Sequence, residues 1–291
     1  MNFKRRESKE LYIEKTYINP DGSELPVLAS PGLERFPEIT HFFTTRKGGV
    51  SKGFRESLNF SAAIDERENV MENFDRVAYA LGISRNDIVC TQQEHTANIV
   101  KAERCDGGRG LSPDFSYSEV DGIVTDVPGL AISAYTADCP PVLMYDPVKR
   151  ALGAVHSGWR GTAKRIAALG IEKLTEFYGT DPSDVVCAVG PSICMDCYEV
   201  GAEVAEVFIR EFPQHTDSIL FDKKKDGKYL LNLWKCIEIS LEEAGVRPEN
   251  ISVTDICSCC NSDLLFSHRA TGGKRGIMGA FIMINKDGEE E

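Results

Sequence analysis

The sequence predicts a protein of the α/β class with α+β character: a single domain with mixed, largely antiparallel sheets flanked by helices. Strand-like and helix-like segments follow one another along the chain, but without the regular alternation that a doubly wound fold requires. Several β-rich segments also follow each other directly, and the turn at Asp146-Pro147 joins two of them into a predicted hairpin. We expect residues 31–291 to form the main domain and residues 1–30 to form an extension of leading strands packed on it.

The first half of this domain is expected to contain a strand, a helix and two further strands. Residues 39–46 (ITHFFTTR) have the composition of a strand and enter the glycine-rich turn KGGVSKG. Residues 68–82 place apolar side chains at helical spacing and end at Gly82, which predicts a helix with a glycine C-cap. Two more strands are expected at 87–93 and 97–103.

The second half is expected to contain a β-rich run followed by alternating helices and strands. The segments of the run are 121–126, 130–139, 141–146 and 151–158. Residues 162–179 have apolar side chains roughly on one face, which predicts a helix with Thr162 as its N-cap. The remaining expected elements are strands at 184–193, 251–257 and 276–285 and helices at 204–212 and 231–246.

The charge of the chain excludes two classes of partner. The formal net charge is −12 at pH 7, so the phosphates of nucleic acids and of membrane surfaces would be repelled. A small anionic ligand is still compatible where arginines concentrate positive potential. The N-terminus lacks the apolar core of a signal peptide, and no run approaches the roughly 18 apolar residues of a membrane-spanning helix. We therefore expect a cytoplasmic protein, either a monomer or a homodimer.

Ten cysteines in a cytoplasmic chain are expected to be reduced. They are then buried small side chains, ligands or nucleophiles rather than a framework of disulfides. The acidic tail KDGEEE is expected to be a solvated end.

A cysteine and a histidine lie at the two ends of the predicted hairpin. Cys139 ends one strand and precedes two prolines, and His156 ends the strand that returns from the Asp146-Pro147 turn. His95 lies in a further polar bend between strands. Three such ligands with a fourth position open would suit Zn²⁺ or copper. The spacing matches no short zinc-finger pattern, however, and by itself favours a buried thiol and a hydrogen-bonded imidazole.

Two other features allow more than one interpretation. Asp138, next to Cys139, is either a general acid or base or a hydrogen-bonded carboxylate at a strand end. Cys194-Met-Asp-Cys197 is a C-x-x-C pair, and Cys257-Ser-Cys259-Cys260 is a candidate partner for it in a structural metal site. We expect the second segment to contribute its C-x-C pair, Cys257 and Cys259, so the pattern is imperfect. Incidental thiols near the surface are the favoured interpretation.

With these residues in hand, the chain resembles the laccase-domain, or multicopper polyphenol oxidase, family, whose members are now regarded as zinc-dependent purine nucleoside phosphorylases. The resemblance runs from about residue 38 to the C-terminus. It is carried by FFTTRKGGVS, QQEHT, DGIVTD, TADCPPVL, AVHSGWRG, VGPSI with CYEVG, and LFSHR, in the family's order. The chain has Ser267-His268-Arg269 where the family has SYR, and Asn73-Phe74 where it often has an Asn-Arg pair.

The resemblance implies roles for individual residues. It implies that His95, Cys139 and His156 are the metal ligands, with Zn²⁺ as the metal and Cu²⁺ as the alternative. It also implies that Arg46 lies in the active site, where a guanidinium beside a glycine turn suits bidentate binding of phosphate.

The function that follows is a purine nucleoside phosphorylase acting at this site, and the same site is also compatible with deamination of adenosine. The expected partners are a small purine nucleoside and phosphate. Arg46 and, more weakly, Arg160 are expected to bind substrate, and Asp138 is the candidate general acid or base. Trp159 is either a stacking face for the purine or, more in keeping with its setting, a core aromatic residue.

Three alternatives of other classes stay open. One is a single-copper oxidase of phenols, because five histidines are too few for several copper ions. Another is a metal-free hydrolase or deamidase with Cys139 as nucleophile and His156 as base. The third is a non-catalytic partner in the cell envelope.

Overall fold

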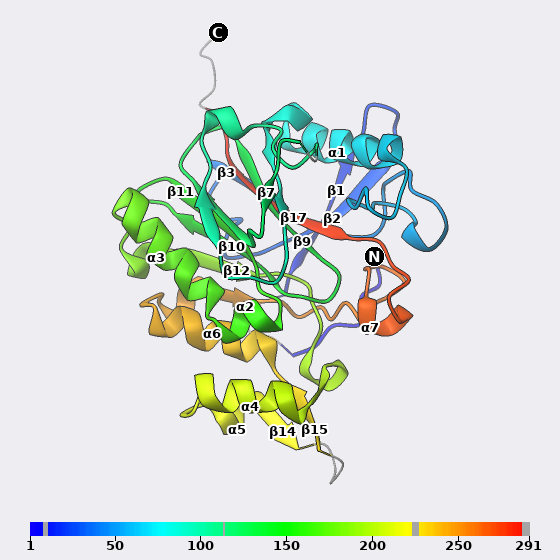
Figure 1. Ribbon diagram of the computed structural model, residues 1–291. Coiled ribbons are helices and arrows are strands. Elements are labelled where there is room, and N and C mark those ends of the chain that lie inside the picture. The colour runs from blue at the N-terminus through cyan, green and yellow to red at the C-terminus, as the bar shows by residue number, and fades with distance from the viewer. Residues whose placement is uncertain (8–10, 113, 223–226, 287–291) are drawn as a thin grey trace.

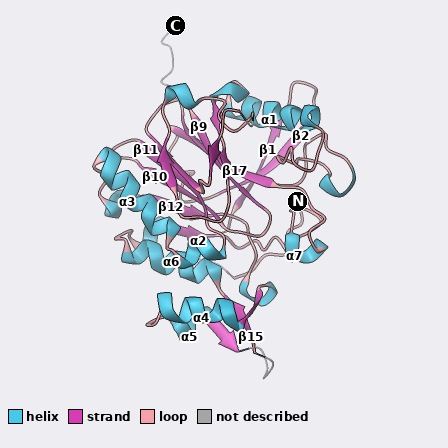
Figure 2. Ribbon diagram, in the orientation of Figure 1, coloured by secondary structure: helices cyan, strands magenta, loops and turns pink. Residues whose placement is uncertain are grey.

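The computed structural model describes residues 1–7, 11–112, 114–222 and 227–286. Two six-stranded sheets pack face to face, and helices cover the outer face of each (Figures 1 and 2). Most neighbouring strands are antiparallel; the first sheet has one parallel pair, at one edge, and the second sheet has a parallel pair at each edge. The predicted class, largely antiparallel sheets flanked by helices, is therefore confirmed. The expected solvated tail falls, after Lys286, outside the described residues.

The first sheet contains the first and the last strand of the described chain. Its strands, in spatial order, are β1 (Ile13–Ile18), β2 (Glu24–Ala29), β3 (Ile39–Thr44), β17 (Met278–Ile284), β9 (Ala131–Thr136) and β4 (Ile88–Val89). The leading strands β1 and β2 form an antiparallel hairpin, and β2 continues the sheet by pairing with β3. The last strand, β17, lies between β3 and β9.

The second sheet contains the predicted hairpin. Its strands, in spatial order, are β16 (Ile251–Val253), β12 (Val186–Val189), β10 (Pro141–Asp146), β11 (Ala151–His156), β8 (Gly122–Thr125) and β6 (Ile99–Lys101). β10 and β11 pair antiparallel with Pro141 opposite His156 and Asp146 opposite Ala151. The hairpin therefore returns the end of β11 to the start of β10, as the turn at Asp146-Pro147 predicts.

Helices cover the two outer faces. On the first sheet lies α1 (Arg67–Leu81), which ends at Gly82 in the left-handed conformation, so the predicted C-cap is correct. On the second sheet lie α3 (Ile166–Tyr178) and α6 (Leu233–Glu243).

The helix expected at 162–179 is in fact two helices, α2 (Trp159–Ala163) and α3. Arg165, with φ 60, interrupts them, so Thr162 lies inside α2 and is not the N-cap of the longer helix. The Arg165 side chain ion-pairs with Glu243 and donates to the carbonyl of Glu211. These are tertiary contacts that no local pattern reveals.

A smaller unit packs beside α2 and α6, at the bottom of Figure 1. It consists of β13 (Glu199–Gly201), β14 (Leu220–Asp222), β15 (Lys228–Leu231), α4 (Ala202–Glu211) and α5 (Thr216–Ile219). The expected strand at 87–93 is split between β4 and β5 (Thr91–Gln92), and β5 pairs with β7 (Tyr117–Ser118) in a separate ribbon. The short helix α7 (His268–Thr271) precedes the last strand.

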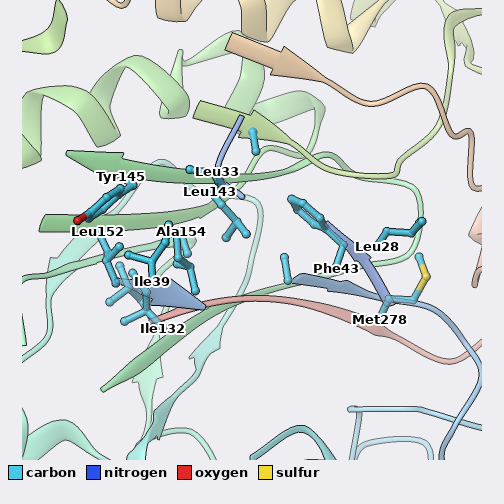
Figure 3. Close-up of a cluster of buried hydrophobic side chains, with 14 of the residues drawn as sticks. Leu28, Leu33, Ile39, Phe43, Ile132, Leu143, Tyr145, Leu152, Ala154 and Met278 are labelled. Atoms are coloured by element: carbon cyan, nitrogen blue, oxygen red, sulfur yellow. The ribbon is translucent and has the colours of Figure 1, made fainter. Parts of the chain in front are cut away.

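The main core lies between the two sheets. Figure 3 shows Ile39, Phe43 and Ile132 from the first sheet facing Leu143 and Leu152 from the second. Alternate residues of the same strands face the outer helices, because side chains alternate between the faces of a strand. This packing fixes the strand ends on which the site residues lie. Within the described part of the chain, no helix is both long and apolar enough to cross a membrane.

Candidate active site

Three residues from separate segments converge at one end of the second sheet. His156 is the last residue of β11, Cys139 lies two residues before β10, and His95 lies in the bend between β5 and β6. Their ligand atoms all lie within 4.8 Å of one another. Cys139 Sγ is 3.8 Å from His95 Nε2, and the two imidazole rings meet edge to face with centroids 4.8 Å apart. The fold thus brings together all three residues expected as ligands.

This set of donors fits a zinc ion. Typical Zn–S and Zn–N bonds place a sulfur and a nitrogen about 3.6 Å apart at a tetrahedral angle, close to the observed Cys139–His95 separation. Three protein ligands leave a fourth position open, as catalytic zinc sites do. His156 is buried, Cys139 is half-buried and His95 is exposed, so the group opens to solvent on the side of His95.

Asp121 contacts two of the three candidate ligands and was not identified from the sequence. Its Oδ1 lies 2.7 Å from His156 Nδ1, so His156 presents Nε2 to the other ligands. The same carboxylate accepts the backbone N–H groups of Glu94, His95 and Thr96. A carboxylate behind a histidine ligand is a usual means of fixing its ring and tautomer. The sequence did show an aspartate at the start of the predicted strand DGIVTD. It did not show that this strand pairs with β11, which carries His156.

Gly158 leaves room for the triad. A Cβ at this position would lie 2.5 Å from His95 Cδ2 and 3.3 Å from Cys139 Sγ. His95 itself has φ 59, a left-handed conformation that costs about 1–3 kcal/mol in a non-glycine residue unless its surroundings support it. The hydrogen bonds from the His95 and Thr96 amides to Asp121 supply that support.

The three groups form a coupled electrostatic unit. Burial alone would raise the pKa of Cys139, but His156 and His95 outweigh it and lower that pKa to about 6. Burial alone would lower the pKa of His156, but Cys139 and Asp121 raise it to about 9. For Asp121, the hydrogen bonds from His156 and Thr96 overcome the effect of burial and lower the pKa to about 2. Without a metal, the site therefore favours a thiolate beside an imidazolium.

Asp138 is buried beside Cys139, and both of its carboxylate oxygens are hydrogen-bonded. Oδ1 accepts from Ser258 Oγ at 2.6 Å and Oδ2 accepts from the backbone N–H of Arg269 at 2.7 Å. Its backbone has φ 100, so this residue is held away from its ordinary conformation. These bonds join the segment that follows β16 to Asp138, the neighbour of the candidate ligand Cys139.

Arg46 contacts the segment that follows β16, at Ser262 and Phe266. Its guanidinium donates to the carbonyls of Glu56 and Ser262 at 2.8 Å, and it stacks on the ring of Phe266 at 4.7 Å. Partial burial lowers its pKa, although Glu56 and Asp263 act in the opposite direction. Two of its five N–H groups are accounted for by these bonds, which leaves donors for an anion.

Arg160 is exposed on α2, with its guanidinium 4.3 Å from the centre of the Trp159 ring. Trp159 is half-buried and packs with the smaller unit around α4, which supports the interpretation of a core aromatic residue. Arg160, Cys139 and Arg269 all act electrostatically on Tyr198, and the Arg269 guanidinium lies 5.4 Å from the centre of its ring. Burial is the main cause of the raised pKa of Tyr198.

Arg275 is a second residue that the sequence did not indicate. It is half-buried, its Nε is fully buried without a hydrogen-bond partner, and it lies within electrostatic range of Asp138 and Cys139. Burial lowers its pKa, and those two groups counteract the decrease. A buried guanidinium N–H without a partner beside a candidate metal site is suited to bind an anion.

The other histidines do not enlarge the cluster. His41 is buried in the first sheet, where its Nε2 accepts the backbone N–H of Ser30 and burial lowers its pKa to about 3. His215 lies 3.2 Å from a carboxylate oxygen of Glu243. Among the described residues, the histidines that group with a potential metal ligand are His95 and His156. In the described part of the chain, the candidate site therefore groups two imidazoles and one thiol, a donor set suited to a single metal ion.

Known proteins resemble this chain over most of its length. The model of the family described as multi-copper polyphenol oxidoreductase laccase matches residues 40–285. Purine nucleoside phosphorylase YlmD of Bacillus subtilis is 32% identical over 247 residues, which are 84% of this chain and 88% of the relative. Adenosine deaminase RL5, from an unknown prokaryotic organism, is 32% identical over 82% of this chain and 91% of its own length.

A solved structure has the same fold. The crystal structure of the Bacillus licheniformis hypothetical protein YfiH superimposes with a TM-score of 0.84 at 33% identity, covering 93% of this chain and 99% of that one. The residues matched by the family model, 40–285, include His95, Cys139 and His156.

Proposed function

The chain belongs to the multi-copper polyphenol oxidoreductase laccase family, and on that premise we propose that it is a purine nucleoside phosphorylase. The observation that carries the proposal is the convergence of His95, Cys139 and His156 in a chain related to a named purine nucleoside phosphorylase over 84% of its length. The alternative of a single-copper oxidase of phenols is not favoured, because the curated relatives reported above are named as nucleoside enzymes.

The proposed reaction replaces the bond between the sugar and the purine by a bond between the sugar and phosphate. An oxygen of inorganic phosphate attacks C1′ of the nucleoside, the C1′–N9 bond breaks, and the purine leaves with a proton to give the free base and a sugar 1-phosphate. Adenosine, inosine and methylthioadenosine are the candidate nucleosides. Holding phosphate and nucleoside in line can lower the activation barrier by roughly 7–11 kcal/mol.

The arginines of the site are suited to hold the phosphate. Arg46 has free N–H groups beside a glycine-rich turn, and Arg275 has a buried Nε without a partner near Cys139. Arg160 lies on α2, within electrostatic range of Tyr198, and is a weaker candidate because it is exposed. We propose Arg46 and Arg275 as the principal anion ligands and Arg160 as a peripheral one.

Zinc is the proposed metal, with copper as the alternative. His95, Cys139 and His156 would hold it, and it would supply a Lewis acid with one open coordination position. The role of this chain's own residues is to orient the ligands: Asp121 fixes the ring of His156 and the bend at His95, and Gly158 leaves the space that they occupy.

Asp138 holds the active-site segment in place. Because Ser258 and Arg269 already occupy its carboxylate oxygens, we propose that it positions Cys139 and the following segment, with proton transfer as the alternative role.

Deamination of adenosine is a second candidate activity, supported by the relative named adenosine deaminase RL5. It replaces the 6-amino group by oxygen from water and releases ammonia, with no need for phosphate. A metal-free cysteine hydrolase and a non-catalytic envelope protein are not favoured, because the related proteins reported above are named as nucleoside enzymes.

A product assay with adenosine, run with and without phosphate, tests the proposal. Adenine and ribose 1-phosphate that appear only with phosphate support phosphorolysis, and inosine formed in either condition indicates deamination. If the zinc-loaded protein releases no free base from adenosine, inosine or methylthioadenosine, phosphorolysis is wrong.

Variants then separate the roles of the residues. Cys139→Ser should lose the metal and the activity, whereas a covalent thioester at Cys139 would overturn the ligand role. Arg46→Ala should keep the metal and raise the KM for phosphate roughly 10- to 150-fold, the equivalent of about 1.5–3 kcal/mol for a charged hydrogen bond. Arg85→Ala is the matched control, because Arg85 is a surface residue paired with Asp75. An unchanged KM in Arg46→Ala would remove its assigned role.

The ten free cysteines suit a reducing compartment, so we also propose the cytoplasm as the location. The choice between monomer and homodimer stays a prediction.

A further inference from the structure

A second group of potential metal ligands lies apart from the triad in the described part of the chain. Cys194, Cys197, Cys257 and Cys260 place their four sulfur atoms within 4.8 Å of one another. Cys194 and Cys257 are buried, and Cys197 and Cys260 are half-buried. None of these residues belongs to the proposed catalytic site.

Parallel strands bring the two pairs together. β12 and β16 are parallel neighbours, so the loops that leave their carboxyl ends emerge side by side. The pairing extends beyond the strands, with a parallel bridge between Ser192 and Cys257 and a bond from the Ser258 N–H to the Ser192 carbonyl. Each loop then makes a tight turn that directs two thiols to the same point.

Each cysteine pair lies in a tight turn closed by a backbone hydrogen bond, which spans three positions in the first turn and four in the second. In the first, the N–H of Cys197 bonds to the carbonyl of Cys194, and in the second, the N–H of Asn261 bonds to the carbonyl of Cys257. The sequence comparison of Cys257 with Cys259 was wrong: the partner that the structure selects is Cys260. Both halves are therefore C-x-x-C pairs, the usual spacing of structural zinc sites.

The distances agree with a tetrahedral metal site. Four thiolates bound at about 2.3 Å to one zinc ion lie about 3.8 Å from each other. Cys197 Sγ and Cys260 Sγ are 3.5 Å apart, far beyond the roughly 2.05 Å of a disulfide, and all four sulfurs lie within 4.8 Å. An iron–sulfur cubane attaches each thiolate to a different iron, so it would hold the sulfurs further apart.

Neighbouring groups favour thiolates at this point. Arg6 donates from its guanidinium to Cys194 Sγ at 3.3 Å, and the backbone N–H of Cys194 donates to Cys257 Sγ at 3.2 Å. Hydrogen bonds of this kind from a cation and from the backbone are common around zinc-bound thiolates.

We propose that Cys194, Cys197, Cys257 and Cys260 bind a structural zinc ion, a second metal site that has no role in the chemistry of the first. Four protein ligands close the coordination shell and leave no position for substrate.

The proposed zinc site would connect the loops after β12 and β16, which contact Asp138 beside the triad. Ser258, inside the second turn, donates to Asp138 beside the metal ligand Cys139. Arg269 donates its side chain to the carbonyl of Cys197 and its backbone N–H to Asp138. Asn261, just after the second turn, exchanges hydrogen bonds with the backbone of Lys4, which holds the N-terminal segment against the cluster.

Counting zinc ions in the full-length protein tests the proposal. The wild type, refolded or expressed with zinc, should contain two ions per chain. Cys197→Ser and Cys260→Ser should each reduce the count to one and lower the melting temperature. Cys259→Ser is the matched control, since Cys259 lies between the ligands in sequence but outside the group of four, and it should retain two ions.

A second measurement does not depend on variants of the cluster. Cys139→Ser should remove the ion of the triad and leave the ion of the four cysteines. When Co²⁺ replaces this remaining ion, the protein should show the intense charge-transfer absorption of four thiolates. If the wild type contains only one zinc ion and Cys139→Ser removes it, the proposal is overturned. Iron in place of zinc, or disulfides found by thiol titration of the freshly purified protein, would overturn it as well. All of these readouts are independent of nucleoside cleavage, so failure of the proposed function would leave them interpretable.

Discussion

The carboxylate of Asp121 lies 2.7 Å from Nδ1 of His156, and it also receives the backbone N–H of His95 at 3.1 Å. One buried acidic residue therefore orients two of the three candidate metal ligands. His156 is held through its ring, and His95 is held through a strained backbone bend.

Asp121→Asn is expected to weaken zinc binding about 10- to 100-fold, because an amide fixes the ring and charge of His156 less well than a carboxylate does. Chelator competition on the purified variant measures the affinity. Asp75→Asn, on the surface of α1, is the control and should bind zinc like the wild type. An affinity equal to the wild type in Asp121→Asn would show that His156 does not depend on this contact.

Gly158→Ala is expected to abolish activity and reduce zinc content, because the added Cβ would lie 2.5 Å from His95 Cδ2. Gly201→Ala provides the comparison, since the nearest atoms there belong to the mobile end of the Glu203 side chain. Zinc analysis and the product assay check both variants. Full zinc content in Gly158→Ala would mean that His95 can move aside without loss of the site.

Cys139 is expected to titrate near pH 6 in the metal-free protein. Its pKa lies below the ordinary value of 9.0, so the thiolate stabilises the fold at high pH and this contribution is lost as the pH falls through about 6. The pKa of His156 lies above its ordinary 6.5, so the contribution of the imidazolium is present at low pH and is lost as the pH rises through about 9. Thiolate absorbance against pH, with Cys139→Ser as the blank, measures the transition; a midpoint near 9 would contradict the coupling.

Asp138→Asn is expected to lower kcat at every pH without changing the shape of the pH–rate profile, because both carboxylate oxygens serve as acceptors that hold neighbouring segments. Ser258→Ala removes one of these contacts and should give a smaller decrease of the same form. If Asp138→Asn instead removes one limb of the profile, the residue transfers a proton.

Leu143→Ala is expected to lower the free energy of unfolding by about 2–5 kcal/mol, since this side chain is fully buried between the two sheets (Figure 3). Val148→Ala, at an exposed turn position, should change it little. Denaturant unfolding of zinc-loaded protein measures both. A small effect of Leu143→Ala would mean that the sheets repack around the cavity.

Local patterns were sufficient for the elements with strong periodicity. The helix ending at Gly82 and the hairpin around Asp146-Pro147 depend on residues a few positions apart, and both are correct. The helix expected from Thr162 was not, because the backbone at Arg165 is set by contacts with Glu243 and Glu211. A periodic pattern contains no information about such distant partners.

The same distinction applies to the sites. The types of residue and the family resemblance were enough to name His95, Cys139 and His156, since few side chains bind zinc. Asp121 lies 35 positions from His156, and Cys194 lies 63 positions from Cys257. Whether such residues meet depends on which strands become neighbours and in which register.

The sequence alone therefore determined the strongly periodic elements, the class of fold and the candidate ligands, because hydrophobic spacing and side-chain chemistry are local properties. The tertiary structure decided how the strands divide between sheets, that Asp121 contacts two residues of the triad, and that Cys260 rather than Cys259 completes the group of four thiols. These outcomes follow from the packing of two sheets around a shared core, which sets distances between strand ends that no short stretch of sequence specifies.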